Sequence, residues 1–207
     1  MMVDSFNSRV NGHDNIAVPF VEAELKKNGL DSIRYGVEIY AKIFQQALYK
    51  LGRQNDMALR DRFKPDLYIL PVGIIPPLLC EIKSENRGHP NFAIEFDSYC
   101  AAKIWDGGSK QVIYTFVDFN NSIQIKLCWL EDVRFIEVRV PNRFDFAKNM
   151  LELNKKYPYV QFVEVPHTGG AGTPFFLIPK ISIYLKPLDM FIKQNFIQPP
   201  IRQLNLL

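Results

Sequence analysis

Two short segments of this sequence bring acidic and basic side chains together in a pattern that could do chemistry. The first is Pro65-Asp66, which precedes the apolar run LYIL, and the second is Glu81-Ile82-Lys83, which follows the run LLC. Two carboxylates can bind a divalent cation, and a nearby ammonium group can hold a water or a phosphate. The triplet alone is weak evidence, because a second acid-x-Lys triplet occurs at Glu24-Leu25-Lys26.

The two segments are predicted to face each other across a β-hairpin. If the chain folds back about Gly73 and Ile74, Asp66 lies opposite Glu81, and opposed residues have Cβ atoms about 4.5–5.5 Å apart. Two carboxylates at that separation repel each other unless a cation lies between them. Lys83 falls on the same face as Glu81, because side chains alternate along a strand.

The opposite face of this hairpin is expected to be apolar, formed by Leu67, Ile69, Cys80 and Ile82. A simpler interpretation stays open, since polar-out, apolar-in alternation is ordinary in sheets. On that interpretation the segment is a solvent-facing strand edge with a salt bridge between Glu81 and Lys83, or between Asp66 and Lys64.

A helix is predicted next, over residues 91–105. On it, Asn91, Glu95, Tyr99 and Lys103 recur every four residues as one polar stripe. The helix follows the Glu81 strand after a short loop, so its stripe can lie beside the carboxylates, although a solvated helix face is the alternative.

At these residues the sequence resembles the PD-(D/E)xK nuclease superfamily, over roughly residues 34–130. The resemblance implies an α/β, restriction-endonuclease-like fold: a mixed central sheet with an α-β-β-β-α-β core flanked by helices, and a C-terminal addition. Many members carry Gln-x-x-x-Tyr in the helix after the lysine strand, where this chain has Glu95 and Tyr99. The first core strand is not clear from the sequence; residues 57–62 are one candidate.

The resemblance also implies the roles of the site residues. Asp66, Glu81 and the Ile82 carbonyl would bind Mg²⁺ or Mn²⁺, and Lys83 would hold the attacking water or the scissile phosphate. Glu38 would complete the metal site, with Glu22 and Glu24 as competitors, and Glu95 and Tyr99 would orient Lys83 or contact the DNA backbone.

Basic residues near the site fit a phosphate track, with solubility as the alternative explanation. They are Arg60, Arg62, Lys64, Arg87 and Lys103, and further basic groups lie in 134–156 and in the tail, where Lys180, Lys186, Lys193 and Arg202 stand against Asp189.

We expect one domain over residues 1–207, with a core at about 34–130 and an extension at 131–207 packed on it. Helices are predicted over 18–29, 34–51 and 144–156, with a short one near the C-terminus. Strands are predicted on both sides of Gly73, over 111–119 and 123–130 as a hairpin, over 133–140 and near 160. The Gly-rich segment 166–174 is predicted to be a mobile loop.

Composition excludes several classes of protein. The 207 residues carry a net charge of +3 and 47% apolar residues, which fits a folded globular domain. The longest apolar run, 67–80, is too short and too rich in proline to span a membrane, and no signal peptide is visible. The spacing of Cys80, Cys100 and Cys128 matches no zinc or redox motif, so buried reduced thiols and a cytoplasmic location are expected.

The sequence therefore predicts a Mg²⁺-dependent deoxyribonuclease, an endonuclease that hydrolyses DNA phosphodiester bonds. It could be structure-specific, like the Holliday junction resolvases, and a homodimer. The apolar, Phe-rich tail is either the dimer interface or part of the core; its residues are Phe175, Phe176, Phe191 and Phe196. The alternatives are a non-catalytic DNA-binding protein on the same fold, a restriction-type enzyme and an RNA-directed nuclease.

Overall fold

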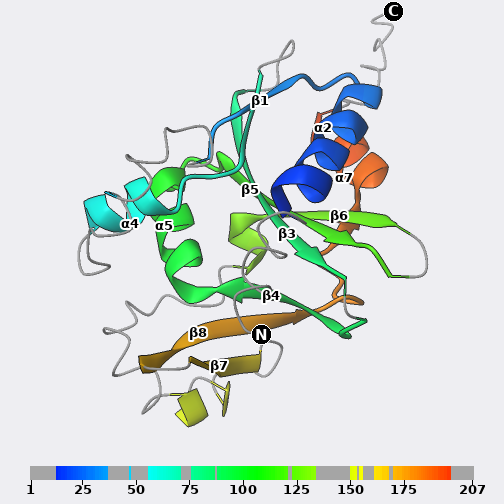
Figure 1. The fold of residues 1–207 in the computed structure, drawn as a ribbon. Coiled ribbons are helices and arrows are strands. Elements are labelled where there is room, and N and C mark those ends of the chain that lie inside the picture. Colours follow the sequence, from blue (N-terminus) through cyan, green and yellow to red (C-terminus); the bar gives the residue numbers. More distant parts are fainter. Residues whose placement is uncertain are drawn as a thin grey trace, which may run out of the picture.

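The computed structural model describes residues 13–36, 47, 56–70, 76–86, 88–120, 123–133, 150–152, 154–155, 161–167 and 170–196. The strands of this part of the chain form two sheets, and helices pack on them (Figure 1). The α/β class is therefore confirmed.

The larger sheet is six-stranded, in the order β1-β2-β3-β5-β6-β9. Its neighbours are antiparallel except for β3 and β5, which are parallel. Parallel neighbours need a crossover connection, and here the chain makes it through β4 and α5. The strands are β1 (Ser32–Arg34), β2 (Leu67–Ile69), β3 (Leu78–Glu85), β5 (Val112–Asp118), β6 (Gln124–Trp129) and β9 (Lys186–Pro187).

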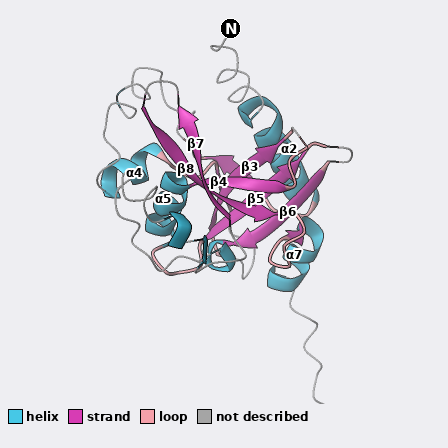
Figure 2. Cartoon of the chain, turned by 90° about the horizontal axis from the view of Figure 1, so that it is seen from below, coloured by secondary structure: helices cyan, strands magenta, loops and turns pink. Residues whose placement is uncertain are grey.

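Helices cover both faces of this sheet (Figures 1 and 2). On one face, α2 (Val18–Lys27) and α7 (Leu188–Phe196) pack on Leu67, Cys80 and Ile82. On the other face, α5 (Phe96–Asp106) packs on Leu79 and Tyr114, with α4 (Asp56–Arg62) beside it. Alternate side chains of the central strands thus enter two separate cores, which explains why β5 is almost wholly buried.

The smaller sheet has the order β4-β8-β7 and is antiparallel. Its strands are β4 (Asn91–Glu95), β8 (Gly170–Pro179) and β7 (Gln161–His167). Phe92, Ile94, Phe162 and Phe176 from this sheet are buried in the same core as the α5 face of the larger sheet. A π-helical turn (His13–Ala17) precedes α2, and a 3₁₀ turn (Leu130–Val133) follows β6.

Several predicted elements are confirmed. The predicted helix over 18–29 is α2, with a proline in its first turn and Lys26 and Lys27 in its last. Both strands of the Asp66–Glu81 hairpin are present, as are the hairpin of β5 and β6 and the strand near 160. The tail forms a short strand and a helix as expected.

The N-terminal half differs from the prediction in two places. Residues 57–62 belong to helix α4 and not to a strand. The strand that precedes β2 in the antiparallel series β1-β2-β3 is therefore β1. Because β1 ends at Arg34, the predicted helix over 34–51 does not begin there. The remainder of that helix lies outside the described residues, apart from residues 35–36, which are not helical, and the helical Ala47.

The C-terminal half differs at the Gly-rich segment. His167 pairs with Gly170, and the strands β7 and β8 continue on either side, so 166–174 is largely a β-hairpin and not a loop. The predicted strand over 133–140 lies almost entirely outside the described residues. Of the predicted helix over 144–156, residues 150–152 and 154–155 are described, and they are helical.

Two of the residues proposed for a dimer interface belong to the core. Phe176 and Phe191 are 1% and 2% exposed, whereas Phe175 and Phe196 are half-buried. Cys80 and Cys128 are buried, Cys100 is half-buried, and all three are free thiols. None of the helices in the described ranges has the length and apolar character needed to cross a membrane.

A charged cluster ties the C-terminal half to the ends of β3 and β5. The Lys180 Nζ atom lies 2.9 Å from Glu85 Oε2 and 2.7 Å from Asp118 Oδ2, and all three side chains are largely buried. Asn120 donates to both carboxylates, at 2.6 Å and 2.8 Å. Lys180 is thus engaged with two acids, which corrects its assignment to a DNA-facing patch.

We predict that Lys180→Met destabilises the protein by roughly 3–5 kcal/mol, because it leaves two buried carboxylates uncompensated. Burial by itself raises the pKa of Asp118, but the hydrogen bonds from Lys180 and Asn120 outweigh it, so the pKa lies below its usual 3.8. That stabilisation is present above pH 3.8 and is lost as the pH falls through the lower native pKa. Urea denaturation at pH 7 and pH 3 should show the difference from wild type shrinking at the lower pH.

The matched control is Lys193→Met, which removes an exposed ion pair with Asp189 on α7. Such a pair contributes little, so the control should unfold close to wild type. Equal stability of the two variants would contradict the role given to Lys180.

Candidate active site

The two acidic segments lie where the hairpin prediction places them. Strands β2 and β3 pair in the predicted register, with Leu67 opposite Cys80 and Ile69 opposite Leu78. Asp66 directly precedes β2, and its Oδ2 accepts a 2.6 Å hydrogen bond from the Ile82 amide. This bond holds the Asp66 carboxylate against the segment of β3 that carries Glu81 and Lys83.

The apolar face of the hairpin is also as predicted. Leu67, Ile69, Cys80 and Ile82 are each 0% exposed and pack under α2 and α7. Because side chains alternate along a strand, Glu81 falls on the other face, toward α5.

Glu81 forms a compact network with Lys83 and Ser98. Its Oε1 atom lies 2.6 Å from Lys83 Nζ and accepts a 2.8 Å hydrogen bond from Ser98 Oγ. Lys83 Nζ also donates to Ser98 Oγ at 3.2 Å. Glu81 is only 8% exposed, since β3 has neighbours on both sides and α5 above it. The predicted alternative, a salt bridge on a solvent-facing edge, is therefore right about the Glu81–Lys83 pair but wrong about its surroundings.

Burial and the neighbouring charges shift the pKa values of Glu81 and Lys83. Burial raises the pKa of the Glu81 carboxyl above its usual 4.5, and Asp66 raises it further, although the Lys83 charge opposes both. For Lys83, burial alone lowers the pKa, but the charges of Glu81 and Asp66 outweigh it and the pKa lies above its usual value. The site thus combines a stabilised Lys83 ammonium group with a Glu81 carboxyl whose pKa is raised.

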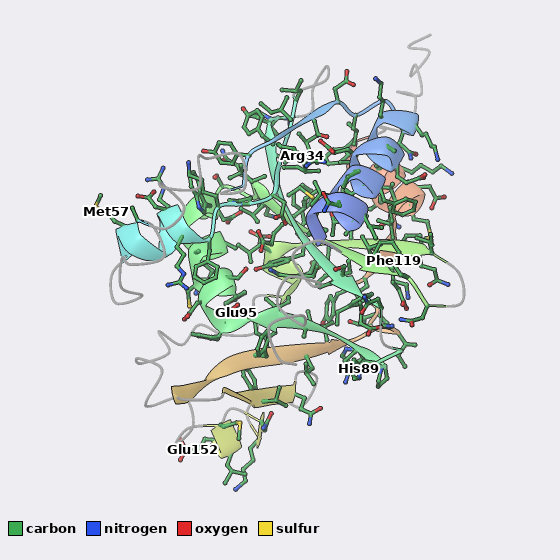
Figure 3. All side chains as sticks on the ribbon, in the orientation of Figure 1. Arg34, Met57, His89, Glu95, Phe119 and Glu152 are labelled. Atoms are coloured by element: carbon green, nitrogen blue, oxygen red, sulfur yellow. The ribbon has the colours of Figure 1, made fainter. Side chains whose placement is uncertain are left out.

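The predicted polar stripe is wrong in its first half. Residues 91–95 form strand β4, and Figure 3 shows Glu95 where β4 leads into α5. Glu95 still lies close enough for its charge to raise the pKa of Lys83. Tyr99 is 1% exposed and packs edge-on against Phe176, so it is a core residue and not part of a polar stripe. Lys103 Nζ lies 5.8 Å from the centre of the Tyr99 ring.

Of the three candidate third acids, the two that the structure describes do not lie at the site. Glu38 lies outside the described residues. Glu22 pairs with Arg34 at 3.2 Å, and Glu24 pairs with Lys27. Both belong to α2, which covers the opposite face of the sheet, so neither completes the carboxylate pair.

Sequence reasoning missed Ser98. It is 3% exposed and contacts both members of the ion pair from α5. The only signal was a hydroxyl in the helical segment FDSYCAAKIW, one turn after the predicted site residue Glu95. Tyr114 was missed as well: it is buried on β5, where burial and the charge of Glu81 raise its pKa well above its usual value.

Four of the five residues of the predicted basic track lie within the described part of the chain, and the fourth of these, Lys103, is on α5. Arg60 and Arg62 are on α4, and Lys64 lies between α4 and β2, within a few residues of Asp66. Arg87 lies outside the described residues.

The donor set fits a cation held by two carboxylates. The Asp66 carboxylate is bonded to the amide of Ile82, next to Glu81, and its charge contributes to the raised pKa of Glu81, a repulsion that a divalent cation would relieve. The described residues contain no group of three acidic, histidine or cysteine side chains arranged to bind a metal. Mg²⁺ commonly keeps several waters and takes one or two carboxylates, so a pair with the Ile82 carbonyl is a suitable set.

Comparison of the sequence with models of known protein families gives no match, and comparison with curated proteins gives none either.

We predict that the Glu81–Lys83 pair costs stability. Replacing both residues (Glu81→Leu with Lys83→Met) should stabilise the protein by about 1–4 kcal/mol, whereas Lys83→Met alone should destabilise it by roughly 3–5 kcal/mol. Since the native pKa of Glu81 is raised, the native state loses stability as the pH rises above about 4.5. The advantage of the double variant should therefore grow from pH 4 to pH 7 in denaturant titrations. A double variant no more stable than the single one would contradict this.

Proposed function

We propose that this chain is a metal-dependent nuclease that hydrolyses phosphodiester bonds in DNA, on a restriction-endonuclease-like fold. The observation that carries the proposal is the Asp66 carboxylate bonded to the Ile82 amide, with Glu81 and Lys83 on either side of Ile82, on one face of β3 and hydrogen-bonded to each other. A cluster of this composition is costly to bury, and costly buried charges are typical of functional sites.

The order of elements also supports the proposal. Among the described elements, the series α2, β1, β2, β3, α5 and β5 has the α-β-β-β-α-β order that the resemblance implies, with α4 and β4 inserted. This series begins at α2, which precedes the expected start of the core near residue 34. In it, β1 to β3 form an antiparallel meander, and α5 leads to the parallel neighbour of β3.

Each residue has a distinct part in the proposed reaction. Asp66, Glu81 and the Ile82 carbonyl would hold Mg²⁺ or Mn²⁺, which would supply charge to polarise the phosphate and to lower the pKa of a water. Lys83 has three N–H donors, and Glu81 and Ser98 accept two of them within the described part of the chain. The third is suited to a phosphate oxygen or the attacking water. Ser98 orients Lys83 and Glu81 toward each other.

We predict that the protein cleaves plasmid or branched DNA with Mg²⁺ or Mn²⁺ and that EDTA abolishes cleavage. Lys83→Ala and Asp66→Asn should each lower the rate at least about 100-fold, because they remove charge that the transition state requires. Gel assays on supercoiled and four-way-junction substrates measure both effects.

The chain provides a matched control in its other acid-x-Lys triplet. Glu24 and Lys26 lie on α2, on the far face of the sheet, so Glu24→Gln and Lys26→Ala should cleave like wild type. DNA binding without cleavage, unchanged by Asp66→Asn, would instead indicate a non-catalytic DNA-binding protein, and preferential cleavage of RNA would indicate an RNA-directed nuclease.

Metal binding has a readout that does not depend on activity. At ten times its dissociation constant, Mg²⁺ should stabilise the protein by about 1.4 kcal/mol, which corresponds to a Tm increase of roughly 3–6 °C. Asp66→Asn should abolish most of the increase, whereas Glu24→Gln should keep it. An equal Mg²⁺-dependent shift in Asp66→Asn would place the ion elsewhere.

A further inference from the structure

Three aromatic side chains gather beside the carboxylate pair. Tyr35 follows β1, Tyr68 is on β2 and Trp105 is on α5. The Tyr35 ring centre lies 6.1 Å from that of Tyr68 and 5.7 Å from that of Trp105, the latter edge-on. All three rings are half-buried, packed against the core beneath them. We call these three residues the aromatic platform.

Cationic side chains lie over two of these three rings. The Arg60 guanidinium is 4.3 Å from the centre of the Trp105 ring, and Lys64 Nζ is 5.1 Å from that of Tyr35. The Trp105 indole donates to the Arg60 carbonyl at 3.1 Å, which fixes α4 against α5. Arg60 is exposed, so the platform meets solvent with positive charge at its edge.

The second tryptophan shows what a purely structural aromatic cluster in this chain looks like. Trp129 packs against Phe191 and Phe196, at 5.3 Å and 6.1 Å, and its indole donates to the Asn195 side chain. Its described ring neighbours are thus apolar, whereas those of Trp105 include a guanidinium.

The platform is continuous with the candidate active site. Tyr68 lies two residues beyond Asp66 and therefore on the same face of β2, while the Tyr35 amide donates to the Asp66 carbonyl at 2.9 Å. Trp105 lies two helical turns beyond Ser98, which is about 10 Å along α5 and on the same side of the helix.

We propose that the aromatic platform binds unpaired bases of single-stranded DNA next to the cleavage site, with Arg60 and Lys64 contacting the backbone. This deepens the proposed function, on which the choice of DNA rests. Aromatic rings bind single strands because every unpaired base offers a π-face, whereas the bases of a duplex are stacked on each other. The preferred substrate is thus a DNA with a single-stranded arm or flap close to the scissile phosphate.

Tryptophan fluorescence tests the proposal directly, because the chain has two tryptophans. In the Trp129→Phe variant, emission comes from Trp105. Titration with a short oligothymidylate in EDTA, without cleavage, should quench this emission to saturation, and a duplex of equal length should bind several-fold more weakly at the same salt concentration. Unchanged Trp105 emission at saturating single strand, or tighter binding of the duplex, overturns the proposal. Tighter binding of oligouridylate than of DNA overturns the assignment to DNA.

The contributions of the two tryptophans to DNA binding can be compared in variants, by measuring the fluorescence anisotropy of a labelled oligonucleotide. Trp105→Ala should weaken binding at least about fivefold, the lower end of what one stacked base contributes, and Trp129→Phe should not change it. Because Trp105→Ala could disturb packing, Arg60→Gln provides a second test at an exposed residue. It should weaken binding and reduce the salt dependence by about one phosphate contact, with an unchanged circular dichroism spectrum.

If Trp105→Ala or Arg60→Gln binds the oligonucleotide with the same affinity as Trp129→Phe, the proposed role of the aromatic platform is wrong. These readouts need no catalysis, so the two proposals fail separately. Cleavage of DNA without quenching of Trp105 emission would refute only the proposal that the aromatic platform binds bases. Quenching without cleavage, whichever metal is added, would refute only the proposal that the protein is a nuclease.

Discussion

The burial of the Glu81–Lys83 pair is the constraint on which the rest of this structure depends. An ion pair with one member 8% exposed must recover its lost hydration from nearby hydrogen bonds and charges. Here β3 must be a central strand so that its main chain is paired on both sides, and α5 must cross above it to supply the Ser98 hydroxyl. The parallel β3–β5 pairing, which requires a crossover, is the topology that places a helix there.

The part of this arrangement that depends on local pattern could be read from the sequence. The two-residue period of strands, applied to a symmetrical hairpin, predicted the β2–β3 register and the face shared by Glu81 and Lys83. It also predicted the apolar face that α2 and α7 cover. Ser98 could not be found in this way, because its partners come from a strand that precedes it by a whole loop and β4.

The error over residues 91–95 has a specific physical cause. Phe92 and Ile94 are buried while Ala93 between them is exposed, so the segment fits a strand, yet its polar residues also continue the four-residue period of α5. Pairing with β8, from Asn91 with Pro179 to Glu95 with Phe175, decides between these patterns. That partner lies far along the chain, so the local pattern alone could not decide between a strand and a helix. The α4 segment was ambiguous for a related reason, being too short to show a helical period.

The Lys180 cluster has a consequence for how the protein is made. The contact between Lys180 and Glu85 joins residues 95 positions apart, and Glu85 ends the strand that carries the candidate active site. At 5–20 residues per second, a ribosome needs roughly 5–20 s to synthesise the intervening chain. During that interval Glu85 and Asp118 lack their cation and β4 lacks its β8 neighbour. The strand that carries Glu81 and Lys83 therefore reaches its final environment only after most of the sequence has been translated.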